Sequence, residues 1–241
     1  MFKNKKILLA AAAVLVVAVV AAGITIFKPA ADNSKPKAHK EGNGDYVIAC
    51  VGDSITYGRG IEDREKHAYP TVLQHLLGPD ATTWNYGYSR RCAGFDTDYP
   101  YVNEEYYEQS LKLDADLYIL MLGTNDSKPY NWDKEAYRES LTQIAKSYKD
   151  TGAKVVLMQS PACFVVEGRD KVAFDIDGDI VATEVHETIG EVANELEIPC
   201  IDLFEATKEH PEWFYDGVHP DADGAAKIAA VIYDFLIINI L

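Results

Sequence analysis

Along residues 46–241, short apolar runs alternate with longer amphipathic patterns, and this alternation constrains the fold more than any other feature of the sequence. Strands that are covered by helices on both faces are continuously apolar, as most of these runs are. Strands are predicted over residues 46–51, 83–86, 117–122, 154–159 and 199–203. Helices are predicted over residues 69–77, 104–111, 134–149, 179–195 and 221–238. The pattern indicates the α/β class with a mainly parallel five-stranded sheet, in which ligands bind at the carboxyl ends of the strands.

The N-terminal residues 1–28 differ from this pattern and are predicted to be a signal anchor or a signal peptide. Three lysines precede the uncharged apolar stretch 7–27, and Lys28 closes it. The apolar region of a secretory signal is usually about 7–15 residues long, whereas a membrane-spanning helix needs about 20. Length therefore favours a retained membrane anchor with its lysines in the cytoplasm and the rest of the chain outside. Small residues near the end of the stretch leave cleavage and secretion open.

Residues 29–45 contain lysine, proline and glycine but almost nothing apolar, so they are predicted to be a flexible tether before a single domain at 46–241. The net charge of the chain is -15. A surface this acidic repels nucleic acid and anionic lipid headgroups, so no nucleic-acid partner is expected and membrane contact is expected through the N-terminal helix only. Neutral or cationic substrates are favoured on the same ground.

Neither a disulfide framework nor a metal site is indicated by the spacing of the candidate residues. The four cysteines form no C-x-x-C pair, and a disulfide between Cys92 and Cys163, which fall in predicted loops, is left open. Aspartates in three loops could ligate the metal of a phosphoesterase, but no Asp-x-His follows the first strand and only His219 lies in a motif typical of a site. No metal or other cofactor is expected.

Three loop motifs carry the candidate chemistry. Gly-Asp-Ser-Ile follows the first predicted strand and contains Ser54, Gly-Thr-Asn-Asp follows the third and contains Asn125, and Asp-Gly-Val-His-Pro precedes the last helix and contains Asp216 and His219. The spacing of three lets the Asp216 carboxylate accept a hydrogen bond from the histidine ring. Taken singly, each motif is more often a turn, a helix cap or a surface histidine. The Gly-x-Ser-x-Gly elbow of α/β-hydrolases and the phosphate-binding P-loop are both missing from the sequence.

Together and in this order, the three motifs resemble the SGNH hydrolases, also called the GDSL esterase/lipase family, over about residues 47–236. The resemblance implies a three-layer α/β/α sandwich similar to flavodoxin. It also implies that Ser54 is the nucleophile, that His219 is the general base, and that Asp216 orients it. The implied oxyanion hole combines the Ser54 N–H, the Asn125 side chain and one backbone N–H from a further block.

That further block, residues 85–91, departs from the family pattern, because Arg90 occupies the place where the family usually has a glycine. Any residue except proline supplies a backbone N–H, so Arg90 is the expected donor, and Gly87 is the alternative. Two questions follow for the structure. The first is whether an arginine adopts the backbone angles that a glycine would, and the second is whether its side chain narrows the site.

The function that this implies is a serine esterase that hydrolyses short-chain esters, preferably acetyl esters of carbohydrate, through an acyl-enzyme. Aromatic residues after the second and third strands offer faces for sugar rings, namely Tyr86, Tyr88, Tyr99, Tyr101, Tyr106, Tyr107, Tyr130 and Trp132. No apolar lid segment suits a fatty acyl chain. The expected partner is a small-molecule or glycan ester. The alternatives are a lysophospholipase or thioesterase with the same triad, and a catalytically impaired, tethered glycan-binding protein.

Overall fold

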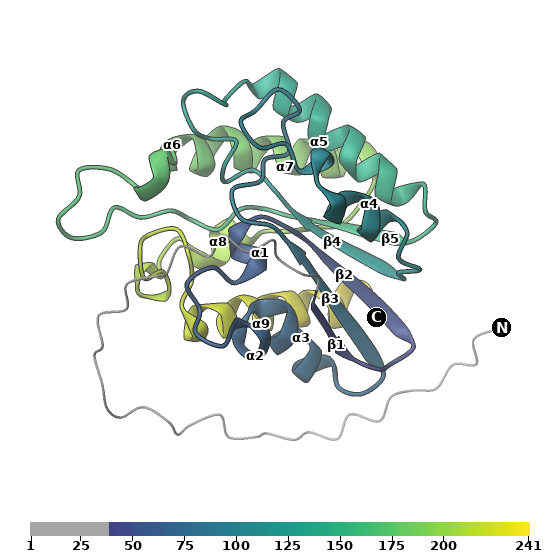
Figure 1. The fold of residues 1–241 in the computed structure, drawn as a ribbon. Coiled ribbons are helices and arrows are strands. Elements are labelled where there is room, and N and C mark those ends of the chain that lie inside the picture. Colours follow the sequence, from purple (N-terminus) through teal and green to yellow (C-terminus); the bar gives the residue numbers. More distant parts are fainter. Residues whose placement is uncertain (1–38) are drawn as a thin grey trace, which may run out of the picture. The chain divides into compact units, whose positions relative to one another are not determined.

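The computed structural model describes residues 39–241, and these form one six-stranded sheet with helices on both faces (Figure 1). The strand order is β1-β3-β2-β4-β5-β6, and β2 to β6 pair in parallel. The strands are β1 (His39–Gly42), β2 (Tyr46–Gly52), β3 (Ala81–Gly87), β4 (Leu117–Met121), β5 (Lys154–Met158) and β6 (Cys200–Ile201). The expected mainly parallel sheet of five strands is confirmed, with one further strand at its edge.

That further strand, β1, lies in residues that the sequence assigns to the tether. It pairs antiparallel with β3, with His39 opposite Asn85 and Gly42 opposite Thr82. An edge strand is held mainly by main-chain hydrogen bonds, so the lack of apolar residues in β1 gives no pattern from which to predict it. The tether assignment is therefore wrong for residues 39–42.

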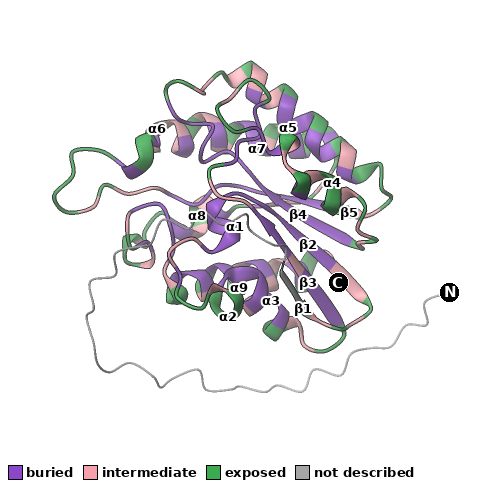
Figure 2. Cartoon of the chain, viewed as in Figure 1, coloured by how far each residue is buried: buried purple, intermediate pink, exposed green. Residues whose placement is uncertain are grey.

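The central strands are apolar because each of their faces meets a layer of helices. Ile48 and Cys50 of β2 point into one buried cluster and Ala49 and Val51 point into the other, as the two-residue period of a strand requires. Burying each large apolar side chain contributes about 1.5–3 kcal/mol. In Figure 2 the central strands β2 to β5 are mostly buried, and the longer helices that cover the sheet carry both buried and exposed residues. The predicted three-layer α/β/α sandwich is confirmed.

One face of the sheet is covered by α3 (Tyr69–Leu77) and α9 (Ala222–Asn239), and the other by α4 (Glu105–Leu111), α5 (Lys134–Lys149) and α7 (His186–Leu196) (Figure 1). The helix predicted over 179–195 is interrupted, because a π-helical turn at Val181–Val185 separates α6 (Gly178–Ile180) from α7. The remaining α-helices in the described residues are short: α1 (Ser54–Tyr57), α2 (Arg64–His67) and α8 (Leu203–Thr207). Aspartates cap α5 and α9, with Asp221 accepting from the Gly224 N–H at 2.8 Å.

The predictions for the N-terminus lie mostly outside these residues. The predicted membrane segment 7–27 is not among the described residues, so anchoring, cleavage and export stay predictions. Within residues 39–241, no helix combines the length and the apolar character that crossing a bilayer requires. The four cysteines, including Cys92 and Cys163, are free thiols.

Candidate active site

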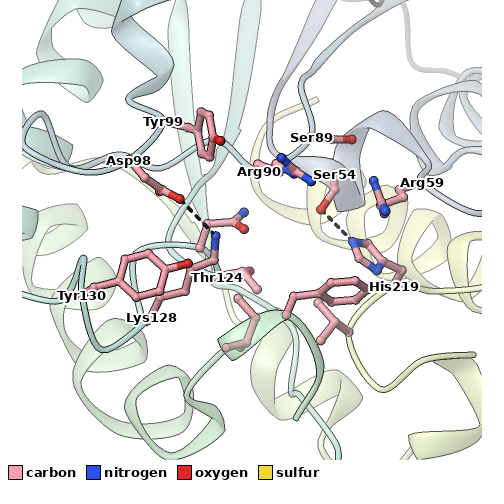
Figure 3. Close-up of a pocket in the computed structure, with 14 residues that line it drawn as sticks. Ser54, Arg59, Ser89, Arg90, Asp98, Tyr99, Thr124, Lys128, Tyr130 and His219 are labelled. Carbon is pink, nitrogen blue, oxygen red and sulfur yellow. Dashed lines mark hydrogen bonds and ion pairs between the residues drawn. The ribbon is translucent and has the colours of Figure 1, made fainter. Parts of the chain in front are cut away.

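The three motifs meet at the carboxyl end of the sheet, where Ser54 begins α1 directly after β2 and His219 precedes α9. The Ser54 Oγ lies 2.8 Å from His219 Nε2, although the two residues are 165 positions apart in the chain. On the other side of the ring, His219 Nδ1 lies 2.8 Å from Asp216 Oδ2. Ser54 and His219 are 6% and 3% exposed. A serine hydroxyl, an imidazole and a carboxylate therefore form one hydrogen-bonded chain; Figure 3 shows its Ser54–His219 contact.

The Asp216–His219 loop is held by the aspartate itself. Asp216 Oδ1 accepts the backbone N–H of Val218 at 3.0 Å and that of His219 at 2.7 Å, which leaves Oδ2 for the ring. Gly217 has a φ of 84°, and a Cβ there would lie 2.1 Å from the Phe164 carbonyl oxygen, so no other residue fits. Burial acts to raise the pKa of Asp216, but the hydrogen bonds from His219 and Val218 outweigh it and hold that pKa below its usual value. The carboxylate is therefore charged while it orients the ring.

Ser54 is presented by a tight turn between β2 and α1. Asp53 caps α1 by accepting the Ile55 N–H at 2.9 Å on Oδ1. The backbone at Gly52 approaches the Thr56 hydroxyl so closely that a Cβ would lie 2.2 Å from it. Burial raises the pKa of the Asp53 carboxyl to about 7, against the opposing hydrogen bond from Ile55. The Ser54 N–H, at the first position of α1, donates to no atom in the described part of the chain, so it is an open donor of a residue that lines the pocket.

Asn125 reaches the same pocket from the loop after β4, and it is 7% exposed. Its Nδ2 donates to Asp53 Oδ2 and to the Arg91 carbonyl oxygen, both at 3.2 Å. Its neighbour Asp126 accepts the Gly94 N–H at 2.7 Å, which ties the loop after β3 to the loop after β4. Burial raises the pKa of Asp126 to about 6 against this hydrogen bond. The amide is thus held beside Ser54, with both of its N–H groups engaged in long hydrogen bonds.

Arg90 has a φ of 72°, so it occupies the left-handed conformation that favours glycine. Its backbone N–H has no hydrogen-bond partner among residues 39–241, and its side chain lines the pocket beside Ser54 (Figure 3). The Gly87 N–H, in contrast, donates to Asn85 Oδ1 at 2.9 Å. A Cβ on Gly87 would lie 2.1 Å from the Tyr57 nitrogen, so this glycine serves the packing of β3 against α1. Of the two candidate donors, only Arg90 has an open N–H.

Replacing Arg90 with glycine should leave ester hydrolysis nearly intact. The substitution keeps the backbone N–H and removes a left-handed strain of roughly 1–2 kcal/mol, while glycine adds about 0.5–1 kcal/mol of backbone entropy cost. Hydrolysis of 4-nitrophenyl acetate is expected to stay within about threefold of wild type, since an oxyanion donor removed outright costs about 10²–10³-fold. Thermal unfolding should be unchanged or shifted slightly upward. A hundredfold loss of kcat in a folded Arg90→Gly would instead assign the chemistry to the guanidinium.

The pocket around these residues has a volume of about 300 Å³. Two of the tyrosines expected at a sugar-binding surface, Tyr99 and Tyr130, line it and are 38% and 62% exposed. The others pack against the core, and Tyr101, for example, donates its hydroxyl to the Tyr86 carbonyl oxygen at 2.7 Å. The aromatic set is therefore mostly structural, because these side chains belong to one buried cluster or pack against it.

The pocket also holds residues that the sequence did not single out. Arg59 and Lys128 line it, together with Phe174 from the segment between β5 and α6. The Phe174 ring meets the His219 ring edge-on at a centroid distance of 5.2 Å. Phe174 has a φ of 63°, and Asp175 follows with 59°. Nothing in the local sequence of such an irregular loop predicts where its side chains will point.

Comparison with known proteins agrees with this geometry. Residues 50–227 match the GDSL-like lipase/acylhydrolase family. An acetylxylan esterase from Xylanibacter ruminicola is 32% identical over 206 residues, which cover 77% of this chain and 42% of that protein, so this chain spans less than half the length of the relative.

Two solved structures show a similar fold. A carbohydrate acetylesterase from Sinorhizobium meliloti has a TM-score of 0.66 at 18% identity, covering 80% of this chain and 99% of its own. An acetylxylan esterase from Geobacillus stearothermophilus has a TM-score of 0.61 at 18% identity, covering 79% and 94%. At 18% identity the solved structures show only a similar fold. The match over residues 50–227 shows membership of the family. The chain belongs to the GDSL-like lipase/acylhydrolase family of carboxylic ester hydrolases.

Proposed function

We propose that this chain is a serine esterase that removes acetyl or similarly short acyl groups from carbohydrate, with Ser54 as nucleophile, His219 as general base and Asp216 as the group that orients the base. The observation that carries the proposal is the unbroken hydrogen-bonded chain Ser54–His219–Asp216, with two contacts of 2.8 Å, at the wall of a pocket. Its order is the one in which a proton moves from a hydroxyl to an imidazole beside a fixed carboxylate.

In the proposed reaction, His219 Nε2 takes the proton of Ser54 as Oγ attacks the ester carbonyl. The resulting imidazolium is stabilised by Asp216, whose lowered pKa keeps it charged. The imidazolium then protonates the departing alcohol, and water clears the acyl-enzyme by the same route in reverse. General-base assistance of this kind contributes about 10²–10⁴-fold in rate.

The oxyanion is proposed to lie between the backbone N–H groups of Ser54 and Arg90 and the side chain of Asn125. The two N–H groups have no other partner in the described residues. Asn125 holds two hydrogen bonds of 3.2 Å, both at the long end of the usual range, so one is easily exchanged for a developing negative charge. Each such donor typically lowers the barrier by about 3–4 kcal/mol.

The acyl preference rests on the shape of the pocket and on the relatives. A volume of about 300 Å³ that also carries two exposed tyrosines suits a sugar ring bearing a small acyl group. The similar proteins are an acetylxylan esterase and a carbohydrate acetylesterase. We therefore prefer an acetylated glycan to a lipid or a thioester.

A chain-length series tests this preference. The 4-nitrophenyl esters of acetate, butyrate and octanoate share one leaving group, so their kcat/KM values report the acyl site alone. Acetate should be favoured over octanoate by at least about tenfold, since a single methylene that does not fit costs that much. Acetate release from acetylated xylan should depend on Ser54 in the same way. Faster cleavage of octanoate would contradict the proposal and favour the lysophospholipase alternative.

A further inference from the structure

The charge of the pocket is opposite to the charge of the chain. The chain carries a net charge of -15, yet the pocket is lined by Arg59, Arg90 and Lys128 against one carboxylate, that of Asp98. Lys128 is partly neutralised, with its Nζ 3.7 Å from Asp98 Oδ2. Arg59 and Arg90 form no ion pair with any residue that the structure describes. The expectation of neutral or cationic substrates, drawn from net charge, therefore does not describe the site itself.

Arg59 is fixed in place by its backbone. It stands between Gly58 and Gly60, whose φ values of 84° and 80° only glycine adopts easily. The Arg59 N–H donates to the Ser54 carbonyl oxygen at 2.9 Å. Gly60 packs under Tyr215, where a Cβ would lie 2.0 Å from the hydroxyl oxygen. The loop thus ties a half-buried guanidinium to the residue that carries the nucleophile.

The guanidinium of Arg59 rests against an aromatic ring rather than a carboxylate. Its Cζ lies 5.7 Å from the centroid of Phe174, and this is the same ring that meets His219. Such a contact orients the cation while leaving the N–H groups of its planar fork free. A preformed, partly desolvated fork of this kind matches the two oxygens of a carboxylate.

The position of Arg59 decides which part of an ester it faces. In acyl transfer the base returns its proton to the leaving alcohol, so the alcohol part of the substrate lies on the His219 side. Arg59 is on that side, because its guanidinium contacts the Phe174 ring and that ring contacts His219. Arg90 lies on the opposite side of Ser54 (Figure 3). A carboxylate bound by Arg59 would therefore belong to the alcohol, not to the acyl group.

We propose that Arg59 binds the carboxylate of a sugar acid, so that the substrate is an acetyl ester on a ring hydroxyl of a uronic acid or a similar acidic sugar. This inference rests on the proposed function and adds to it the charge of the substrate and the residue that recognises it. Phe174 is the ring against which the guanidinium packs, with the Arg59 Cζ 5.7 Å from its centroid. The acetyl group then lies toward Arg90 and Asn125, where the open N–H groups are.

Three model substrates test the assignment: the methyl glycoside of O-acetylglucuronic acid, the matching neutral O-acetylglucoside, and the O-succinylglucoside, whose charge is on the acyl group. Wild type should favour the glucuronide over the glucoside by about tenfold or more in kcat/KM, because one charge-assisted hydrogen bond typically changes binding by that factor. In Arg59→Gln that ratio should fall to about one, and Arg59→Lys should lie between, because lysine keeps the charge and loses the fork. The exposed Arg169→Gln, which makes the same change of charge outside the pocket lining, should keep the wild-type ratio.

Added salt should lower the ratio in wild type and leave it unchanged in Arg59→Gln, because only an ion pair is screened. A wild-type ratio of one or less, or a ratio that Arg59→Gln does not change, would overturn the inference. Preference for the succinyl ester would also overturn it, because it would place the anion on the acyl side. Each of these outcomes leaves esterase activity itself intact, whereas failure of the proposed function would appear as hydrolysis of the neutral acetate that does not require Ser54.

Discussion

Replacing Ser54 with alanine should lower the kcat for 4-nitrophenyl acetate by more than about 10⁴-fold, because no other hydroxyl is placed to form the acyl-enzyme. Among the described residues, the Ser54 Oγ is the hydroxyl that contacts His219 Nε2, at 2.8 Å. The remaining activity would come from the oxyanion donors and from binding, which the substitution leaves in place. Initial rates at saturating substrate, measured over at least four decades of enzyme concentration, give the comparison.

The fold of Ser54→Ala should survive. Removing the hydroxyl leaves one ring nitrogen without a partner, at a cost of about 1 kcal/mol, which corresponds to roughly 2–4 °C in Tm for a domain of this size. Ser147→Ala is the matched control, since the Ser147 hydroxyl accepts a hydrogen bond from the Tyr107 hydroxyl on α4 and lies outside the pocket lining. It should change Tm to a similar extent and leave kcat within about twofold. Turnover by Ser54→Ala near that of the control would remove Ser54 from the chemistry.

The location of the candidate site could be predicted from the sequence because parallel strands end at one edge of a sheet. Once β2 and β4 are recognised, the loops that contain Ser54 and Asn125 must lie side by side, whatever their own conformation. The segment containing His219 precedes α9, whose apolar stripe must cover the same sheet, so it too is brought to that edge. The order and direction of the strands and helices thus predict that Ser54, Asn125 and His219 lie at one edge of the sheet, although no local sequence pattern links them.

What the sequence left open depends on backbone angles and side-chain packing. The proposal of Arg90 rather than Gly87 as oxyanion donor rests on a φ of 72° at Arg90 and on the Gly87 N–H, which already donates to Asn85; residue identity reveals neither. The position of the Phe174 side chain in the pocket wall depends on two consecutive residues, Phe174 and Asp175, with left-handed backbone angles in an irregular loop. The charge of the pocket arises because three cations and one carboxylate line it, whereas the net charge of the chain counts every charged residue.

Replacing Asp216 with asparagine should lower kcat by about 10⁴-fold while the loop keeps its shape. The amide oxygen of the introduced asparagine would still accept the N–H groups of Val218 and His219, as Asp216 Oδ1 does at 3.0 and 2.7 Å. The second position, however, would become an NH₂ group, which cannot accept the hydrogen bond that His219 Nδ1–H donates to Asp216 Oδ2. The ring would then adopt the tautomer with its proton on Nε2, where it points at Ser54 Oγ and cannot accept the hydroxyl proton.

The matched control for this change is Asp221→Asn, five residues along the same segment. Asp221 caps α9 by accepting the Gly224 N–H at 2.8 Å, and asparagine caps a helix as well as aspartate does, so activity and Tm should both stay close to wild type. In Asp216→Asn the loss should fall on kcat and much less on KM, because the pocket walls are unchanged. A double variant with Ser54→Ala should be no slower than Ser54→Ala alone, since residues that act as one unit are not additive. A loss below tenfold in Asp216→Asn would mean that the ring is oriented by its packing against Phe174, and that the carboxylate only holds the loop.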